Sequence, residues 1–335
     1  MELSLDELQQ DVIFYRSQCW SVNTNRTYRT HRKLYLLFCH KAGLQPVPAS
    51  TNQLCLYAAF LARRLKYNSL KQYMNIIRIL HLEWGLPNPM TDNFILSSTL
   101  RGIRRHMGDS TQRKAPMTPT LLFNLLNYLD ITTSQGANTW AAALVMFYGL
   151  LRISNVLPAS IRKFNPKLHL RRRDITFTAT GVLITIRWSK TNQFRTRVFS
   201  LPLPRRLQGH KLCPAQAIFH AFRLSAGAPL EGPPFVTRLG DSFQPLTTAS
   251  FIQQVKSALG QICDPKDYAG HSFRRGGACW AYANGVSVDL IRQLGDWKSN
   301  SYTRYILCDQ PMVSQALTLM TNSLPMTDRP TNVTN

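Results

Sequence analysis

Four basic residues between positions 152 and 274 are of types that can hold an anion. Arg152 directly follows the apolar run 147–151, and a guanidinium at the end of a buried segment is costly unless an anion or a carboxylate meets it. His271 and Arg274 are three residues apart, so on a helix they share one face. Lys190 falls at the turn between two strand-like segments. Each residue by itself is also compatible with a salt bridge or a solvated position. Only the four residues together can indicate a functional site.

The net charge narrows the class of partner. The chain has 40 Lys and Arg against 17 Asp and Glu, which gives a net charge of +23 over 335 residues. A surface that basic attracts a polyanion, and a nucleic acid is the default candidate. An anionic membrane is the competing partner, but no run of about 18 apolar residues is present, so we predict no membrane interaction.

Other features bound the compartment and the cofactors. The first residues are acidic and show no basic segment followed by an apolar one, so no signal peptide is expected. The seven cysteines lack framework spacing and are predicted to be reduced thiols of an intracellular protein. Neither a phosphate-binding glycine loop nor a metal-ligand motif is present, so we expect no cofactor and no metal.

The elements that must position these residues fall into two predicted domains. Residues 1–105 form the first, with helical apolar spacing and capping residues between 22 and 103. Residues 106–117 are polar, basic and glycine-containing, which is typical of a linker.

The second predicted domain spans residues 118–321 and mixes helices with a small sheet. Helical patterns over 121–129 and 138–156 come before three strand-like segments, 174–178, 182–188 and 195–201, which predict an antiparallel sheet. Helical patterns then return, and residues 322–335 form a polar tail predicted to be disordered. The fold class is therefore mainly α with a small antiparallel β-sheet, built as a helical domain followed by an α+β domain.

The order of the basic residues resembles that of the tyrosine recombinase (phage integrase) family. An Arg in a helix, a Lys in a β-hairpin, His-Ser-Phe-Arg-Arg-Gly-Gly, Leu-Gly-Asp-Trp and Arg-Tyr-Ile follow one another in that order. The wording of the motifs is most similar to recombinases of eukaryotic DIRS- and Ngaro-type retroelements, with Crypton-type transposons next. The motifs are Leu150–Asn155, Trp188–Lys190, Gly270–Arg274, Leu294–Trp297 and Tyr302–Tyr305.

The resemblance implies a helical core-binding domain, a catalytic domain, and cleavage of DNA through a 3′-phosphotyrosine bond. Arg152 and Arg274 would stabilise the charge on the phosphate oxygens, because guanidinium groups are always charged and bind bidentately. Tyr305 would be the nucleophile, Lys190 the general acid, and His271 would assist by proton transfer or hydrogen bonding. No metal or nucleotide is needed for this reaction.

Two positions depart from the family pattern. The acidic residue usually found three positions after the first Arg is Asn155 here, which can orient a neighbour but holds no charge. The usual His or Trp nine residues before the tyrosine would be Asp296, whereas the chemically suitable residue is Trp297. We predict that Trp297 packs against the phosphate or supports Tyr305. Tyr302 is a competing nucleophile by residue type alone.

Phosphate contacts outside the centre would come from the remaining positive charge and give affinity without sequence information. A helix at 311–320 with one apolar face either packs on its own domain or docks into a neighbouring protomer, which would imply a homotetramer on double-stranded DNA. Nuclear action is expected from the eukaryotic resemblance. The alternatives are a non-cutting DNA-binding protein, a type IB topoisomerase and, from charge alone, an RNA-binding module. The predicted DNA-binding residues are Arg104, Arg105, Arg171, Arg172, Arg187, Arg195, Arg275 and Lys298.

Overall fold

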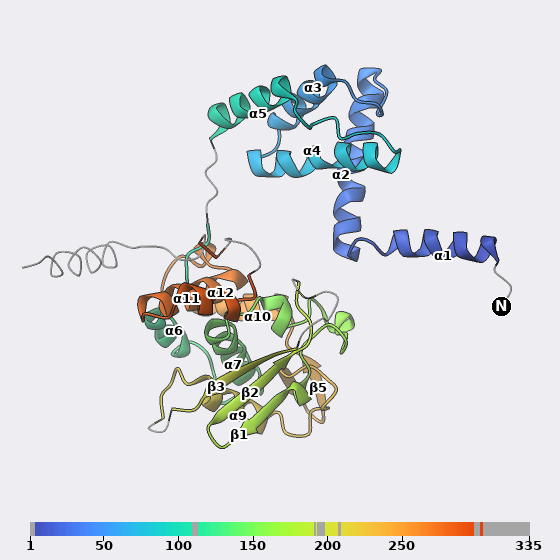
Figure 1. Ribbon diagram of the computed structural model, residues 1–335. Helices are drawn as coiled ribbons and strands as arrows, with labels where there is room; N and C mark the ends of the chain where they lie inside the picture. Colours follow the sequence, from blue (N-terminus) through green and yellow to red (C-terminus); the bar gives the residue numbers. More distant parts are fainter. Residues whose placement is uncertain are drawn as a thin grey trace, which may run out of the picture. The chain divides into compact units, whose positions relative to one another are not determined.

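The computed structural model describes residues 4–108, 113–190, 192, 198–206, 209–297 and 302–303. The chain divides into two compact units, 1–112 and 113–335, and each is described by itself. Both are mainly helical, and the second also contains the predicted three-stranded antiparallel sheet together with a two-stranded one (Figure 1).

Unit 1 consists of helices α1 (Leu5–Ser17), α2 (Val22–Ala42), α3 (Thr51–Ala62), α4 (Tyr67–Glu83) and α5 (Phe94–Met107). Side chains of Ser21, Ser50 and Asn93 accept hydrogen bonds from the first turns of α2, α3 and α5, which fixes where these helices begin. The core includes Tyr35 and Tyr57, both fully buried. Helix α1 has no buried residue and was not predicted.

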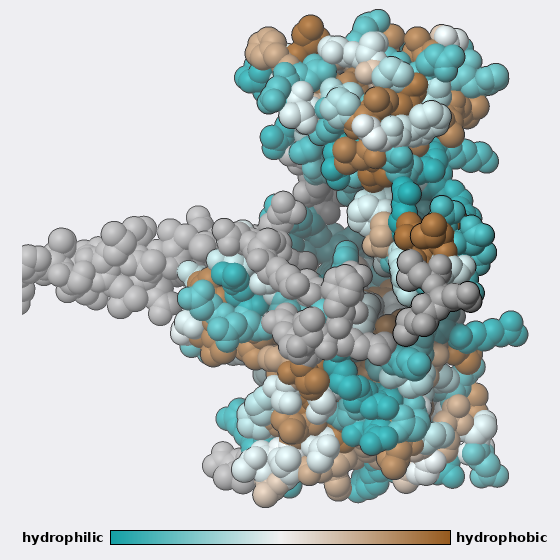
Figure 2. Space-filling model, turned by 45° about the vertical axis from the view of Figure 1, so that its right-hand side comes forward, coloured by the Kyte–Doolittle hydropathy of each residue, from teal (hydrophilic) through white to brown (hydrophobic). Residues whose placement is uncertain are grey.

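Apolar side chains also remain on the surface of unit 1. Trp84 and Phe94 are each 74% exposed. Figure 2 shows such brown side chains scattered between hydrophilic ones over the part of the surface in view. Single exposed apolar residues are usual for soluble proteins, so these positions alone do not mark a binding site.

Unit 2 is built around α7 (Ser134–Tyr148), in which twelve residues are buried. In Figure 1, α11 (Gly270–Ala283) and α12 (Val288–Leu294) lie on one side of α7 and the three-stranded sheet on the other. Helices α6 (Pro119–Leu126), α9 (Pro214–Leu224) and α10 (Thr248–Leu259) complete the shell around the same core. The three short 3-10 turns are 161–163, 172–174 and 265–267.

The main sheet has the order β1 (Ile175–Thr178), β2 (Gly181–Ile186) and β3 (Phe199–Pro204). Leu201 and Leu203 on β3 are buried, whereas the alternating residues Ser200, Pro202 and Pro204 are exposed. Two prolines are tolerated in β3 because it is an edge strand, where a missing N–H breaks no ladder. A second hairpin, β4 (Val236–Leu239) with β5 (Ser242–Pro245), was not predicted.

Besides α1 and the β4–β5 hairpin, the structure differs from the expected elements at three places. The helix predicted over 138–156 is broken, since α7 ends at Tyr148, Leu150 adopts φ 49°, and α8 spans only Ile153–Val156. The third strand, predicted over 195–201, corresponds to β3 from Phe199 to Pro204, and residues 193–197 lie outside the described residues. Of the predicted linker 106–117, residues 106 and 107 belong to α5, and residues 114–117 bond to unit 2 instead of forming a free connection.

The close packing of residues 114–117 on α11 has a simple cause. Met117 N donates to the Ser272 carbonyl at 2.9 Å. A Cβ at Gly276 would lie 1.7 Å from the Met117 carbonyl oxygen, and a Cβ at Gly277 would lie 1.9 Å from that of Phe147. The glycine pair therefore allows α11 to touch two backbone segments at once.

Candidate active site

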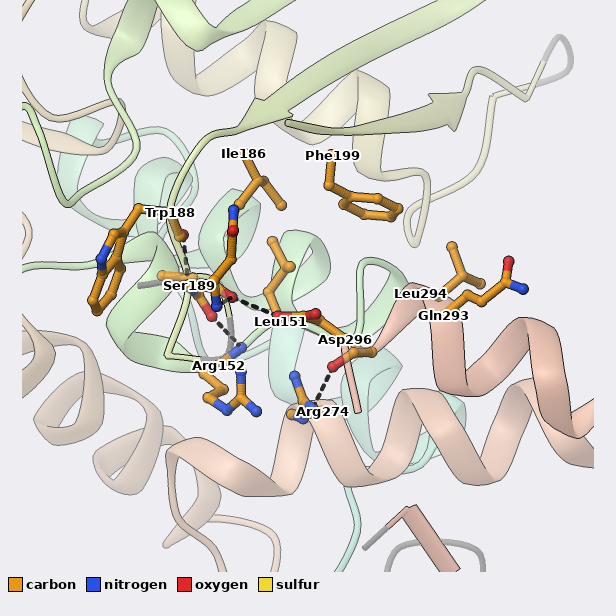
Figure 3. A pocket seen from close by; sticks show the side chains of 13 residues that line it. Leu151, Arg152, Ile186, Trp188, Ser189, Phe199, Arg274, Gln293, Leu294 and Asp296 are labelled. Carbon is orange, nitrogen blue, oxygen red and sulfur yellow. Dashed lines mark hydrogen bonds between the residues drawn. The ribbon is translucent and has the colours of Figure 1, made fainter. Parts of the chain in front are cut away.

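Arg274 is the most deeply buried of the predicted catalytic residues, with 2% of its surface exposed. Its Nη1 donates to the Leu150 carbonyl at 2.6 Å and its Nη2 to the Gly295 carbonyl at 2.5 Å. Its guanidinium also lies 4.0 Å from the centre of the Trp297 ring. Arg274 thus joins the loop before Arg152 to the loop after α12, and it reaches the pocket of Figure 3 from below these loops.

Arg152 lies just before α8 and not within a helix, which corrects the predicted continuous helix. Its backbone N–H donates to Asn155 Oδ1 at 3.3 Å, and Asn155 Nδ2 donates to the Trp188 carbonyl at 3.5 Å. Asn155 is 8% exposed. An amide can accept from one segment and donate to another, whereas a carboxylate only accepts. The departure from the family pattern therefore links Arg152 to the end of β2.

Lys190 is exposed in a tight turn after β2. Asn192 N donates to the Ser189 carbonyl at 3.0 Å and approaches Ser189 Oγ at 3.1 Å, and Asn192 Nδ2 donates to the Arg187 carbonyl at 3.3 Å. A bond from residue i+3 back to residue i defines a β-turn, and Lys190 occupies its second position. The predicted hairpin position of Lys190 thus corresponds to a hydrogen-bonded turn.

His271 is exposed on the first turn of α11, and its electrostatic environment brings the four basic residues together. Partial loss of hydration lowers the pKa of His271 most, and the positive charges of Arg274, Arg152 and Lys190 lower it further. Charges act on a neighbour only at short range in salt solution. Residues spread over more than 100 positions of the sequence, from Arg152 to Arg274, therefore form one cationic centre around His271.

The pocket in Figure 3 joins this centre to an apolar wall. Arg152 and Arg274 line one part of it, while Ile186, Phe199 and Leu294 line another. Its enclosed volume is small, about 40 Å³. A site with two guanidinium groups beside an apolar wall is suited to an anionic group attached to a larger organic molecule.

Trp297 is 6% exposed and packs with Leu150, Ala278 and Ile291 while its ring stacks on Arg274. It therefore supports the guanidinium. Its predicted support of Tyr305 stays a prediction, because Tyr305 lies outside the described residues. Asp296, at the alternative position, lines the pocket.

The two candidate nucleophiles differ in what the structure describes. Tyr302 is partly buried against the cluster that includes Leu150 and Trp297. Tyr305 lies outside the described residues, so its role remains a prediction.

Arg172, one of the predicted DNA contacts, is buried at 7% exposure. Its guanidinium donates to the Phe222 and Pro234 carbonyls and to Ser225 Oγ, and it stacks on the Phe222 ring at 3.8 Å. Burial lowers the pKa of Arg172. These contacts make Arg172 a core residue and contradict the prediction that it binds DNA.

Arg171 and Arg187 instead converge on a buried acid that the sequence reasoning missed. Asp174 is 4% exposed and forms ion pairs with both arginines. Burial by itself raises the pKa of Asp174, but hydrogen bonds from Arg187 and Arg171 outweigh it, and the net pKa is lowered. The only sequence signal was an acidic residue next to three arginines.

The other predicted DNA contacts have varied surroundings. Arg275 is 8% exposed and donates to the Lys114 carbonyl at 2.6 Å, so it holds the segment before α6. Arg104 and Arg105 are exposed on the last turn of α5. Arg195 and Lys298 lie outside the described residues.

The described parts of the chain offer neither a metal site nor a membrane-spanning helix. No group of three or more His, Cys, Asp or Glu residues there could hold a metal ion. No helix there is long and apolar enough to cross a membrane.

Comparison with known proteins shows which proteins this chain resembles in sequence and in fold. No family model matches the chain. An integrase/recombinase XerD homolog of Selenomonas ruminantium is 25% identical over 309 residues, covering 90% of this chain and 86% of that protein. The Tn1549 transposon integrase, solved with transposon right-end DNA, superposes with a TM-score of 0.59 at 13% identity, covering 95% of this chain and all of the other.

A further solved structure gives the same result. The lambda integrase dimer bound to a COC′ core site superposes with a TM-score of 0.55 at 12% identity, covering 90% of this chain and 95% of that one. The chain therefore has the fold of the tyrosine recombinase/integrase family. Its sequence similarity to the XerD homolog agrees with the same family.

Proposed function

We propose that the chain is a site-specific DNA recombinase or integrase that cuts and rejoins double-stranded DNA through Tyr305. The observation that carries this proposal is that Arg152 and Arg274 line one pocket, with His271 close enough to feel the charges of both and of Lys190. Such a cationic centre beside a pocket is suited to a phosphodiester. The similarity to integrases that were solved on DNA supports the same substrate.

The reaction exchanges one phosphoester for another. The Tyr305 oxygen attacks the phosphorus and forms a 3′-phosphotyrosine bond, while the bond from phosphorus to the 5′ oxygen breaks. Lys190 gives its proton to the leaving 5′ oxygen, and the phenol proton leaves through the surrounding solvent or His271. Arg152 and Arg274 stabilise the charge on the non-bridging oxygens. Attack by a 5′ hydroxyl on the phosphotyrosine reverses these steps and reseals the strand.

DNA affinity in this proposal comes mostly from phosphate contacts. The net charge of +23 and the exposed Arg104 and Arg105 of the predicted core-binding domain fit such contacts. Binding governed by phosphates weakens steeply as salt is raised, because counterions are released from DNA.

The finer assignment rests on the motif wording alone. His-Ser-Phe-Arg-Arg-Gly-Gly and Gly-Asp-Trp-Lys-Ser favour a eukaryotic DIRS-, Ngaro- or Crypton-type element, and we therefore propose action in the nucleus. We also propose a homotetramer on DNA, with the apolar face of residues 311–320 exchanged between protomers. The assembly state on DNA is measurable by sedimentation with a duplex that contains two sites.

Covalent trapping tests the function. Labelled DNA with a nick near the cleavage site is incubated with wild type, Tyr305→Phe and Tyr302→Phe, without metal or ATP, and then denatured. The cut fragment diffuses away, so the expected result is an adduct for wild type and Tyr302→Phe but none for Tyr305→Phe.

Each other outcome has a defined meaning. An adduct that persists in Tyr305→Phe and vanishes in Tyr302→Phe moves the nucleophile. Absence of any adduct on DNA that the protein binds refutes the recombinase and favours a non-cutting DNA-binding protein. Supercoil relaxation by the monomer without strand exchange would indicate a type IB topoisomerase.

A further inference from the structure

The turn containing Lys190 is attached to a second, distant segment by a side-chain hydrogen bond. Ser189 Oγ donates to Asp296 Oδ2 at 2.5 Å, across 107 positions of sequence (Figure 3). A carboxylate oxygen is the acceptor in such a pair, so the hydroxyl hydrogen points at Asp296. A hydrogen bond to a charged group is about twice as strong as a neutral one.

The Ser189 side chain is itself fixed in place. It is 6% exposed, and Asn192 N approaches its oxygen at 3.1 Å. The hydroxyl therefore links both sides of the turn around Lys190 to Asp296. A four-residue turn closed in this way has few other conformations.

Asp296 is held equally firmly on its side of the bond. The carbonyl of the preceding Gly295 accepts from Arg274, and the following Trp297 stacks on the same guanidinium. Asp296 has φ 50°, a backbone region that residues other than glycine rarely adopt but that Asp tolerates better than most. The carboxylate is thus presented to Ser189 by a segment that Arg274 anchors.

We propose that Ser189 and Asp296 are positioning residues that hold Lys190 at the leaving 5′ oxygen. The proposal rests on the proposed function. The proposal also gives a role to Asp296, which stands where related proteins usually have His or Trp. Asp296 holds the turn that contains Lys190 and does not contact the phosphate. The Lys190 side chain is long and flexible, so fixing its backbone limits the volume that its ammonium group searches.

A substrate with sulfur in place of the bridging 5′ oxygen isolates this role. A thiolate leaves without receiving a proton, because a thiol is far more acidic than an alcohol. Single-turnover cleavage is measured on the ordinary and the sulfur-containing nicked DNA for wild type, Lys190→Ala, Ser189→Ala and Asp296→Ala. Ser189→Thr, which keeps a hydroxyl, serves as the conservative rescue, and exposed Ser242→Ala and Asp241→Asn serve as matched controls.

Loss of one charged hydrogen bond is expected to slow cleavage of ordinary DNA by about 10- to 100-fold in Ser189→Ala and Asp296→Ala. Both variants, like Lys190→Ala, are expected to cleave the sulfur substrate within about threefold of wild type, since proton donation no longer matters. The double variant is expected to be no slower than either single variant, because both remove the same bond. Ser189→Thr and the controls retain wild-type rates.

Three results would overturn the proposal. The first is that Ser189→Ala cleaves ordinary DNA at the wild-type rate, and the second is that it is equally slow on both substrates. The third is that the double variant is slowed by the product of the factors measured for the two single variants. Failure of the proposed function looks different, since wild type would then form no adduct on either substrate.

Discussion

Replacement of Arg172 by methionine separates a core role from a DNA-binding role. Methionine keeps an unbranched apolar stem but removes the guanidinium with its charge, its donors and its stacking on Phe222. The acceptors left behind are the Phe222 and Pro234 carbonyls and Ser225 Oγ, at 3.1, 3.3 and 3.1 Å from the arginine nitrogens. All three are neutral oxygens in the interior.

The size of the effect follows from these contacts. Each lost hydrogen bond with a buried acceptor left behind costs about 1–1.5 kcal/mol, so three cost about 3–4.5 kcal/mol. Burial disfavours the charged guanidinium, as its lowered pKa indicates, and its removal returns roughly 1 kcal/mol. The expected loss in the free energy of unfolding is therefore about 2–3.5 kcal/mol, or a fall in Tm of about 4–14 °C for a unit of this size.

The assay is urea unfolding followed by tryptophan fluorescence, with DNA affinity measured by gel shift well below the Tm. Arg173→Met is the matched control, because Arg173 is 56% exposed and pairs on the surface with Glu231. Its stability is expected to change by about 0.5 kcal/mol or less. If Arg172→Met unfolds like wild type but binds DNA much more weakly, then the core assignment is wrong and the sequence-based DNA contact is restored.

Two further predictions concern α11. Gly277→Ala places a Cβ 1.9 Å from the Phe147 carbonyl oxygen, so we expect urea unfolding to show about 2–3 kcal/mol of destabilisation. The control is Gly102→Ala, which has open space around it and is expected to be neutral or stabilising. Equal stability of the two variants would contradict the close approach of α11 to Phe147. His271 has a lowered pKa when folded, so the unfolded chain takes up its proton first as the pH falls below about 6.5, and stability is lost between that pH and the folded pKa. In His271→Gln this loss is expected to be smaller, and a difference from wild type that stays constant between about pH 7 and pH 5 would refute the lowered pKa.

Local sequence patterns predicted helices and strands best where capping or turn residues fix the local backbone conformation. The helices of unit 1 and the first two strands of the sheet follow from apolar spacing and from residues that cap or turn. The break between α7 and α8 was missed because nothing near Leu150 forbids a helix. The turn there depends on the bond from Arg274, which lies 124 positions away. Local propensity is a weak guide when such a contact outweighs it.

The candidate site likewise combines residues that the sequence indicated with contacts that only the structure revealed. The order of Arg152, Lys190, His271 and Arg274 indicated the site because it resembles the order in the tyrosine recombinase family. Sequence could not distinguish Arg172 from Arg173, which are adjacent and of the same type, although one is buried and the other exposed. Their different surroundings come from Phe222 and Glu231, which the fold brings near.

The sequence by itself thus determined the class of protein, the predicted division into two domains, and the types of side chain in the cationic centre. These depend on residue identity, charge and local periodicity, all of which are present in the linear chain. Only the tertiary structure decided that Trp297 supports Arg274, that Asn155 joins two segments, and that Ser189 meets Asp296. Each of these is a contact between residues whose distance along the chain says nothing about their distance in space.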